Sequence, residues 1–559
     1  MGPPTRVGNE NSFVKDEMIQ ADILVVGGGF GGVDSLIRLR NQGLSIKLLE
    51  AGGDFGGVWY WNEYPGARVD TDMPSYQLSH PEAWKGFNFT EKFPGWKEIQ
   101  AYFHHVDKQF GLRQDAIFNS RVIGIERKES INKWALSIED GRKAICTYLI
   151  LATGTTNKAY IPDIHGREKF EGQIIHPARW PHELDVRGKK VGLVGIGASG
   201  LQIAQELGEQ DCQLSVFIRN PTTALPMGQR TISEDESENQ KLLWEGIFDF
   251  CKHKSFVGFP HNINTKPYYA STPEERRALF EHLWARGSFV IFNGYYREFG
   301  FDKEVNAEMY RWWREKVRSR MIDSKKMDIL APEKQPYPFA SKRPSLEMHL
   351  WETLDRPNVE VVSVKQTPIK AMNEKGFITD EADGGQRLHE LDIIIFATGF
   401  DNVTGSLYEM QIKDKNGVLL QEKWKDGIIT NLGMMIPDMP NLFMLYGPQA
   451  PTSLANGPPF LELQVEWVQK VLQGLKEKNA DKIETTLEAA KRWKERHLNI
   501  ASKTFYPEAD SWYVGANIPG KRREMMVYVG GMPDWWSQCE RAIDGFQDFH
   551  VSRASVKAW

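Results

Sequence analysis

Short apolar runs of strand character lead into glycine loops and helix-spaced segments at two places in the chain. At 21–26 the run ADILVV is followed by GGGFGG and then by VDSLIRLRNQG, in which apolar residues recur at helical spacing. At 189–194 the run KKVGLV is followed by GIGASG and LQIAQELGEQ. Each segment predicts a β-strand, a tight turn and an α-helix. Because this unit occurs twice, we predict an α/β fold with two Rossmann-like dinucleotide-binding domains.

The pattern changes between 230 and 332, where strand alternation is absent and helix-like segments such as PEERRALFEHLWARG and AEMYRWWREKVRSRM occur. We predict a helical insertion there. Farther on, SLEMHLWETL at 345–354 predicts a helix, and 391–396 predicts a buried strand that leads into ATGFD. The chain is then expected to return to the first domain.

Composition narrows the class of protein. The chain has 559 residues, 41% of them hydrophobic and 26% charged, as in a globular protein of several domains. A net charge of -5 argues against binding to nucleic acid or to an anionic membrane. Four cysteines without paired or metal-ligand spacing predict neither a disulfide framework nor a metal site, which suits the cytoplasm. No apolar run is long enough to predict a membrane span, and the polar start predicts no signal peptide.

The first glycine loop has the spacing of a dinucleotide site. Gly27, Gly29 and Gly32 form G-x-G-x-x-G, with Gly31 inside it. Absent side chains let the backbone turn sharply, approach a pyrophosphate and pack the helix on the sheet. The next strand, SIKLLE, ends at Glu50, where a carboxylate can accept hydrogen bonds from a ribose. Since the loop lies near the N-terminus, as in flavoproteins with two dinucleotides, we predict that it binds FAD.

The second loop repeats the spacing but differs in the residue that follows its second strand. Its predicted contacts are Gly195, Gly197, Ala198, Ser199, Gly200 and Gln202. The strand QLSVFIR ends at Arg219, in the position that Glu50 holds in the first unit, and Asn220 follows it. A guanidinium there would pair with a 2′-phosphate, which a carboxylate would reject. We therefore predict NADPH as the second dinucleotide.

These predictions divide the chain into parts. The parts are an N-terminal tail at 1–20, the first part of an FAD-binding domain at 21–155, a linker at 156–188, an NADP-binding domain at 189–229 and 333–389, the helical insertion at 230–332, and the second part of the FAD-binding domain with a mobile C-terminal segment at 390–559.

Two further patterns accompany the loops. One is F-x-G-x-x-x-H-x-x-x-W-P, formed by Phe170, Gly172, His176 and Trp180 with a following Pro. The other is G-G-x-W-x-x-x-x-[FY]-P-G-x-x-x-D at 56–70. Both resemble the signatures of Baeyer–Villiger monooxygenases at every fixed position, and the first lies between an FAD-type and an NADP-type loop, as in that family. The resemblance spans most of residues 20–535.

The resemblance implies further site residues. To the FAD site it adds Val58, Trp59, Tyr60, Trp61, Asp70, Tyr76, Val122 and Gly457. To the NADP site it adds Lys342 at the phosphate, Arg343, and Trp512 near the nicotinamide or substrate. In the family a Thr usually follows the phosphate-binding Arg, where this chain has Asn220. Arg343 and Asp70 are implied as catalytic residues, and we expect them to meet over the flavin although they are far apart in sequence.

The implied activity is oxidation of a small ketone to an ester or lactone with O2 and NADPH, through a C4a-peroxyflavin. His176 and Trp180 are implied as structural links between domains and not as an acid or base. No nucleic acid, membrane or obligate protein partner is expected.

Two alternatives remain open. A related monooxygenase could oxidise nitrogen or sulfur, although Trp180 and the pattern at 56–70 count against it. A redox-responsive FAD-binding interaction protein would use the same loops without turnover. A pyridine-nucleotide disulfide reductase is excluded because C-x-x-C is missing.

Overall fold

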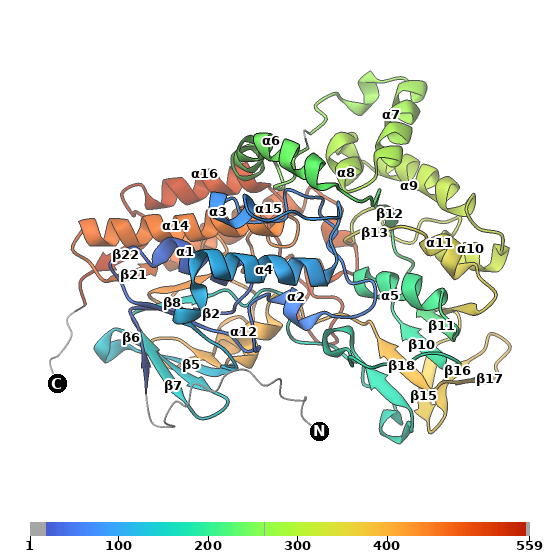
Figure 1. The fold of residues 1–559 in the computed structure, drawn as a ribbon, viewed down its shortest axis with the longest axis horizontal. Helices are drawn as coiled ribbons and strands as arrows, with labels where there is room; N and C mark the ends of the chain where they lie inside the picture. Colours follow the sequence, from blue (N-terminus) through green and yellow to red (C-terminus); the bar gives the residue numbers. More distant parts are fainter. Residues whose placement is uncertain (1–17, 262, 555–559) are drawn as a thin grey trace.

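Two five-stranded parallel sheets form the framework of the protein. The computed structural model describes residues 18–261 and 263–554. In Figure 1 one sheet, with β2 and β8, lies at the lower left, and the other, with β10 and β18, lies at the lower right. The predicted α/β class with two Rossmann-like units is confirmed.

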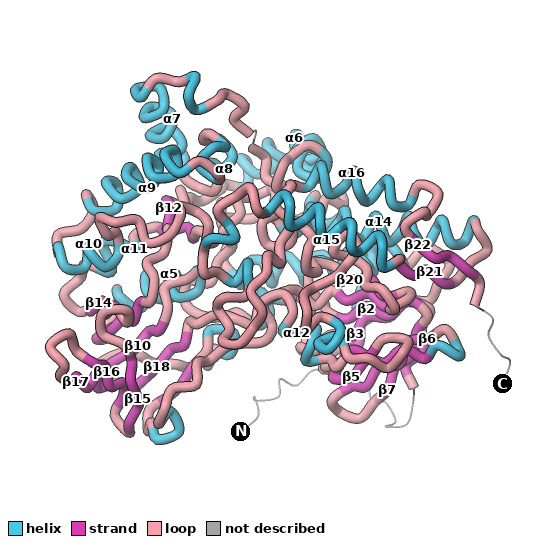
Figure 2. Tube along the Cα trace, turned by 180° about the vertical axis from the view of Figure 1, so that it is seen from behind, coloured by secondary structure: helices cyan, strands magenta, loops and turns pink. Residues whose placement is uncertain are grey.

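The first sheet has the strand order β20-β8-β2-β3-β4. Its strands are β2 Ile23–Val26, β3 Ile46–Leu49, β4 Ala116–Ile117, β8 Tyr148–Leu151 and β20 Leu442–Met444. All four residues of β2 are buried, as expected of a central parallel strand with helices on both faces. Helix α1 Phe30–Leu39 follows β2, and α14 Gly457–Glu477 packs against α1. From behind, α14 lies with α15 Leu487–Ala501 and α16 Met532–Ile543 over this sheet (Figure 2).

The second sheet has the strand order β14-β11-β10-β18-β9. Its strands are β9 Gln173–Ile175, β10 Lys190–Val194, β11 Gln213–Ile218, β14 Val359–Ser363 and β18 Ile393–Phe396. Helix α5 Ala198–Gly208 follows β10 and repeats the arrangement of α1 after β2.

Two of the predicted domain boundaries disagree with the strand pairing in this sheet. Strand β18 pairs with β10, so the run at 393–396 belongs to the second unit, whereas the boundary at 390 had placed it in the first. Strand β9 pairs with β18, so part of the expected linker at 156–188 is an edge strand of the second sheet. A buried apolar strand suits either sheet equally, and therefore its own sequence does not specify its partner.

Further sheets and helices surround this framework. One mixed sheet contains β1 Ile19–Gln20, β5 Val122–Lys128, β6 Lys133–Ile138, β7 Lys143–Cys146 and β19 Ile412–Lys413. The others are β12 Ala224–Pro226 with β13 Ser345–Glu347, β15 Ile369–Asn373 with β16 Gly376–Asp380 and β17 Gln386–Glu390, and β21 Lys482–Thr485 with β22 Phe549–Ser552. Outside the insertion at 230–332, the other α-helices are α2 Val58–Trp61, α3 Pro81–Trp84, α4 Trp96–Phe110, α11 Leu350–Leu354, α12 Gly405–Glu409 and α13 Leu420–Lys423.

The structure also differs from two predictions of secondary structure, in the N-terminal tail and at 345–354. Residues 1–17 of the expected tail lie outside the described residues, but its last two described residues form β1 and pair with β7. The helix expected over 345–354 is a strand, β13, followed by the short helix α11, because β12 provides a pairing partner for residues 345–347.

The predicted helical insertion forms the upper right of Figure 1. It contains α6 Glu234–His253, α7 Pro273–Arg286, α8 Val290–Gly294, α9 Lys303–Arg318 and α10 Ser324–Leu330. Side chains cap the starts of α6, α7, α9 and α10, among them Thr272, which forms a capping box with Glu275. Within the described residues, no helix is both long and apolar enough to cross a membrane.

Candidate active site

The first glycine of each loop is fixed by close backbone contact with an Ala-Thr-Gly (ATG) turn, at 152–154 for the first loop and at 397–399 for the second. Gly27 has φ +112°, and a Cβ there would lie 2.5 Å from the carbonyl oxygen of Ala152. Gly195 has φ +99°, and a Cβ there would lie 2.6 Å from the carbonyl oxygen of Ala397. Both positions therefore require glycine for conformation and for space. The two ATG turns thus hold the two loops in equivalent ways.

The middle glycine of each loop is placed to receive a phosphate. Gly29 and Gly197 are the N-caps of α1 and α5, and neither helix start has a side-chain cap. A Cβ at Gly197 would meet no described atom within 4 Å, so space is open beside its backbone. Free N–H groups and the positive end of the helix dipole suit a pyrophosphate at both starts. The residues present therefore fit FAD at the first loop and NADP at the second.

Glu50 follows β3 and lies beside the first loop. Its buried carboxylate accepts hydrogen bonds from the backbone N–H of Gly28 at 2.5 Å and of Gly52 at 2.6 Å. Burial raises the pKa of Glu50, and these backbone donors act in the opposite direction. The carboxylate thus supports the loop itself, next to the position where we place a ribose.

Cations gather at the end of β11. Arg219 is exposed there, and burial lowers the pKa of Lys342 to about 8, with the Arg219 cation as the next cause. Lys365 and Arg523 also lower the pKa of Lys342, whereas Asp510, which pairs with Arg523, raises it. Such a cluster of like charges favours a dianion such as a 2′-phosphate. Lys365 and Arg523 had no distinguishing sequence pattern.

The expected meeting of Arg343 with Asp70 is confirmed. Nη2 of Arg343 donates to Oδ2 of Asp70 at 2.7 Å, and Nη1 donates to the carbonyl oxygen of Ser453 at 2.6 Å. The guanidinium also lies 5.5 Å from the ring centroid of Phe289. Burial alone would lower the pKa of Arg343, but the Asp70 carboxylate raises it above its ordinary value. Arg343 is therefore a permanently charged group in a fixed orientation.

Tyrosine hydroxyls surround this pair. Burial raises the pKa of Tyr76, Tyr446, Tyr506 and Tyr513, in the case of Tyr506 to about 12. These phenols are consequently neutral near pH 7 and add no negative charge beside Arg343.

The aromatic segment at 58–61 forms helix α2 next to the first loop. A Cβ on Gly57 would lie 2.9 Å from the Cα of Gly29, so the helix begins against that loop. Nε1 of Trp59 donates to the hydroxyl of Tyr76 at 3.1 Å. A Cβ on Gly457, the first residue of α14, would lie 3.9 Å from the Tyr76 ring. The structure therefore brings together Trp59, Tyr76 and Gly457 among the expected FAD contacts.

Four further residues were expected to contact FAD, namely Val58, Tyr60, Trp61 and Val122. Val58 is 38% exposed, whereas Val122 is buried at the start of β5. The Tyr60 hydroxyl accepts from the backbone N–H of Gly53 at 2.9 Å. Trp61 packs edge-on against Tyr60, with ring centroids 5.0 Å apart.

Hydrogen bonds join the two units between the loops. The hydroxyl of Tyr64 donates to Gln202 at 2.9 Å and accepts from Ser199 at 3.0 Å. Nε2 of Gln202 in turn donates to the carbonyl oxygen of Arg68 at 3.0 Å. Tyr64 and Arg68 belong to the pattern at 56–70, whereas Ser199 and Gln202 lie in α5. The pattern marked Tyr64 only as an aromatic position, so its bridging hydroxyl was not predicted.

The signature His links the linker to the second ATG turn. Nε2 of His176 donates to the carbonyl oxygen of Gly399 at 3.0 Å, and Nδ1 accepts from the N–H of Ala178 at 3.2 Å. Burial lowers the pKa of His176, which favours this neutral form. Phe170 is buried beneath Gly172, and Trp180 packs against the main core. These positions agree with structural links.

Trp512 lies in a C-terminal segment that contacts the same turn. Asn517 donates to the carbonyl oxygen of Phe400 at 2.8 Å, and Lys521 pairs with Asp401 at 2.7 Å. Trp512 itself is partly buried against the hydrophobic cores. The segment thus contacts the turn that follows β18 of the second unit, whereas Trp512 packs on the core of the first unit.

Known proteins resemble this chain over nearly its whole length. Residues 20–230 match the family described as flavin-binding monooxygenase-like. Cyclopentanone 1,2-monooxygenase from Comamonas sp. is 37% identical over 544 residues, which cover 97% of this chain and 97% of that protein. Phenazine N-monooxygenase from Lysobacter antibioticus is 32% identical over 539 residues, 95% of this chain and 97% of that protein. A solved structure of oxidised steroid monooxygenase bound to NADP is 34% identical, with a TM-score of 0.89, and covers 96% of this chain and 100% of that one.

Proposed function

The chain belongs to the Baeyer–Villiger monooxygenases, and from this premise we propose that it converts a small-molecule ketone into an ester or lactone with NADPH and O2. FAD, when bound, supplies the activation of oxygen, and NADP(H) is the second dinucleotide. The observation that carries the proposal is the ion pair of Arg343 with Asp70, at 2.7 Å. The pair lies among neutral phenols where residues of both units meet.

Arg343 acts on the negative charge that develops when oxygen attacks a carbonyl group. Its guanidinium is held by Asp70 on one Nη atom and by the Ser453 carbonyl on the other. A cation fixed before the reaction stabilises an oxyanion without reorganisation, which usually contributes about 3 kcal/mol or more. Asp70 holds this orientation and offsets the charge. Arg343 also disfavours protonation of an anionic oxygen nucleophile and polarises the carbonyl of the substrate.

Arg219 and Lys342 bind the 2′-phosphate of NADPH in this proposal, and Glu50 supports the loop beside the FAD ribose. Arg219 is exposed at the end of β11, where a ligand can reach it. Asn220, which follows it, is half-buried and offers a side-chain amide as a further donor. Trp512 provides an aromatic surface near the nicotinamide or the substrate.

Oxidation of nitrogen is the second candidate, because phenazine N-monooxygenase is 32% identical over 95% of this chain.

The test of both candidates is incubation of the holoenzyme with NADPH and ¹⁸O₂. The substrates are a linear, a cyclic and an aryl ketone in one set of reactions and a tertiary amine in another. We expect esters or lactones that carry one labelled oxygen atom. An N-oxide without any ester would favour the second candidate. No NADPH consumption with any ketone, despite full FAD occupancy, would favour a binding protein without turnover.

We further propose that the protein works in the cytoplasm without nucleic acid, membrane or an obligate protein partner. The net charge of -5 supports the first part, because nucleic acid and anionic lipid attract cationic proteins. All four cysteines are buried free thiols, which suits a reducing compartment.

A further inference from the structure

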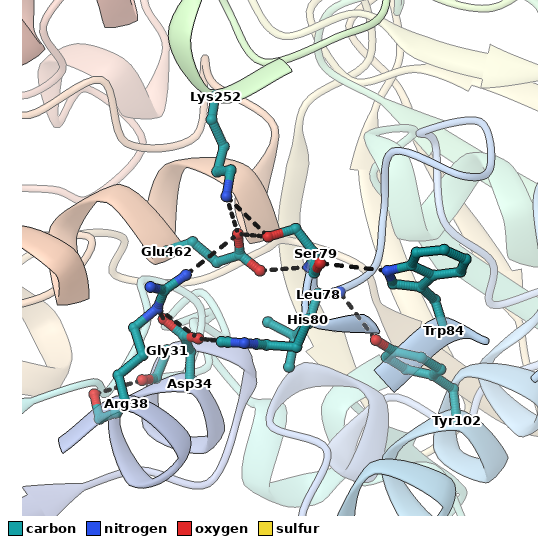
Figure 3. Close-up of polar contacts among 11 residues, drawn as sticks. Gly31, Asp34, Arg38, Leu78, Ser79, His80, Trp84, Tyr102, Lys252 and Glu462 are labelled. Atoms are coloured by element: carbon teal, nitrogen blue, oxygen red, sulfur yellow. Dashed lines mark hydrogen bonds and ion pairs between the residues drawn. The ribbon is translucent and has the colours of Figure 1, made fainter. Parts of the chain in front are cut away.

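A buried charge network connects the phosphate-binding helix of the first unit with α14 and with the helical insertion (Figure 3). Two of its carboxylates are almost fully covered, since the side chain of Asp34 in α1 is 0% exposed and that of Glu462 in α14 is 1% exposed. Buried carboxylates of this kind require partners, and a missing partner is strongly destabilising.

Glu462 binds Ser79, in the loop before α3, through two hydrogen bonds that we call the grip. Its Oε1 accepts from the backbone N–H of Ser79 at 2.5 Å, and its Oε2 accepts from the Ser79 hydroxyl at 2.5 Å. Lys252 of α6 lies 3.3 Å from the same Oε2 and also donates to the Ser79 hydroxyl at 2.9 Å. The grip thus involves the helical insertion as well as α14.

Asp34 holds the next residue of that loop. Its Oδ1 lies 2.6 Å from Nε2 of His80, and Nε of Arg38 donates to its Oδ2 at 3.0 Å. Nη2 of Arg38 also lies 3.8 Å from Glu462. Asp34, His80 and Glu462 have ligand atoms within 4.8 Å of one another, a spacing that would suit a divalent cation. Because Arg38 and Lys252 already balance the two carboxylates, internal ion pairs account for this cluster.

The gripped loop carries Tyr76 three residues before Ser79. At its other end, Nδ2 of Asn456 donates to the carbonyl oxygen of Ser75 at 2.6 Å. Asn456 is the N-cap of α14, so one helix holds the loop on both sides of Tyr76. Between these two points Tyr76 accepts the hydrogen bond from Trp59 and faces Gly457.

We propose that Glu462 is a positioning residue for Tyr76: its two hydrogen bonds to Ser79 fix the flavin-facing loop, and Lys252 ties that grip to the helical insertion. The inference rests on the proposed function in one respect, namely that Tyr76 contacts FAD. It assigns no contact with FAD to Glu462 itself.

Two double variants separate the grip from the charge balance. Glu462→Gln with Lys252→Met removes one charge of each sign, but its amide can still accept from the Ser79 N–H and donate to the Ser79 hydroxyl. Glu462→Met with Lys252→Met has the same charge balance and no such hydrogen bonds. The measurement is the rate of FAD release from each holoenzyme, followed by the fluorescence of freed flavin, together with Tm. Neither readout depends on ketone turnover, so an absence of ester formation would leave this test intact.

We expect FAD release from the Gln/Met variant within about threefold of the unaltered rate, and at least about tenfold faster release from the Met/Met variant. Their Tm values should be similar to each other. Glu466→Met is the matched control, because Glu466 lies one turn along α14 and pairs with Lys470 at 3.0 Å. It should change FAD release less than about twofold, since its ion pair is partly exposed.

Equal FAD release from the two double variants, whether slow or fast, would overturn the proposal. If the Met/Met variant does not fold, Ser79→Ala decides, because it leaves both charges in place and removes only the hydroxyl. Faster FAD release from Ser79→Ala than from Glu466→Met would support the grip, and equal release would refute it.

Discussion

Arg343 and Asp70 stand 273 positions apart in the chain, and their side chains form an ion pair of 2.7 Å. Asp70 ends the aromatic segment of the first unit, whereas Arg343 follows the helical insertion and precedes β13. The pair therefore forms only when the two units have the arrangement seen here. The hydrogen bonds of Tyr64 with Ser199 and Gln202 join the units in the same region.

Arg219→Ala should raise the KM for NADPH far more than the KM for NADH. The reason is that NADH lacks the 2′-phosphate with which the guanidinium pairs. Loss of a charge-assisted contact costs about 1.5–3 kcal/mol, or roughly ten- to a hundredfold in affinity. Steady-state kinetics with both cofactors measures the effect, and equal increases would remove Arg219 from the phosphate site.

The KM for NADPH should change little near pH 7 and should rise as the pH passes through about 8. Lys342 has a pKa lowered to about 8 by burial and by Arg219, so the folded protein without cofactor loses this charge as pH rises through that value. The phosphate stays dianionic over this range, since its second pKa is about 6. Only the protonated lysine pairs with it strongly.

Lys342 should also make the free energy of unfolding depend on pH. The unfolded chain keeps the Lys342 proton up to its ordinary pKa of 10.5, so between about pH 8 and 10.5 it binds more protons than the folded chain. This group therefore makes the free energy of unfolding rise with pH in that window.

Lys342→Arg keeps its charge throughout and should abolish the rise of the KM for NADPH above pH 8. A rise that persists in Lys342→Arg would assign the titration to another group.

Alanine at the first and middle glycines of the second loop should give opposite phenotypes. Gly195→Ala places a Cβ 2.6 Å from the Ala397 carbonyl at φ +99°, which should lower stability by about 1–3 kcal/mol. Gly197→Ala meets no described atom within 4 Å, so Tm should hardly change. Its methyl group should nevertheless raise the KM for NADPH, because it occupies the space assigned to the pyrophosphate. A Gly197→Ala variant with unaltered NADPH kinetics would place the dinucleotide elsewhere.

Glu50→Arg should yield protein that is poor in flavin. The substitution removes the acceptor for the N–H groups of Gly28 and Gly52 and places a cation beside the ribose position. The ratio of flavin absorbance to protein absorbance after purification measures retention, with Glu245→Arg as a control at a side chain that is 72% exposed. Full retention in Glu50→Arg would mean that the first loop is misassigned.

The sequence predicted the framework because glycine loops and strand periodicity are local features. Gly32 and Gly200 are required by contacts within their own strand–loop–helix units, where an added Cβ would meet the carbonyl oxygens of Gly27 and Gly195, so the glycine spacing alone identified both loops. The sheet that receives β18 was not predictable in this way, since all four of its residues are apolar and buried and would suit either unit. The meeting of Arg343 with Asp70 was expected only from family resemblance, because no local pattern relates residues that far apart.

The network of Asp34 and Glu462 was invisible in the sequence for a different reason. Asp34 and Arg38 have the i,i+4 spacing of an ordinary surface ion pair on a helix. Only the packing of α14 and the loop at Ser79 over α1 shows that these charges are buried. The same limit applies to Tyr64, whose ring was part of a pattern but whose hydroxyl acquires its role from α5.

The proposed reaction depends most directly on Arg343, and product analysis of Arg343→Ala tests it. With the holoenzyme, NADPH, O2 and an accepted ketone, we expect this variant to oxidise NADPH, release hydrogen peroxide and form at least about a hundredfold less ester, which corresponds to about 3 kcal/mol. Asp70→Ala should be slower in both NADPH oxidation and ester formation but still active, because the arginine remains and loses only its anchor. An Arg343→Ala enzyme that converts the ketone at a near wild-type rate would contradict the account.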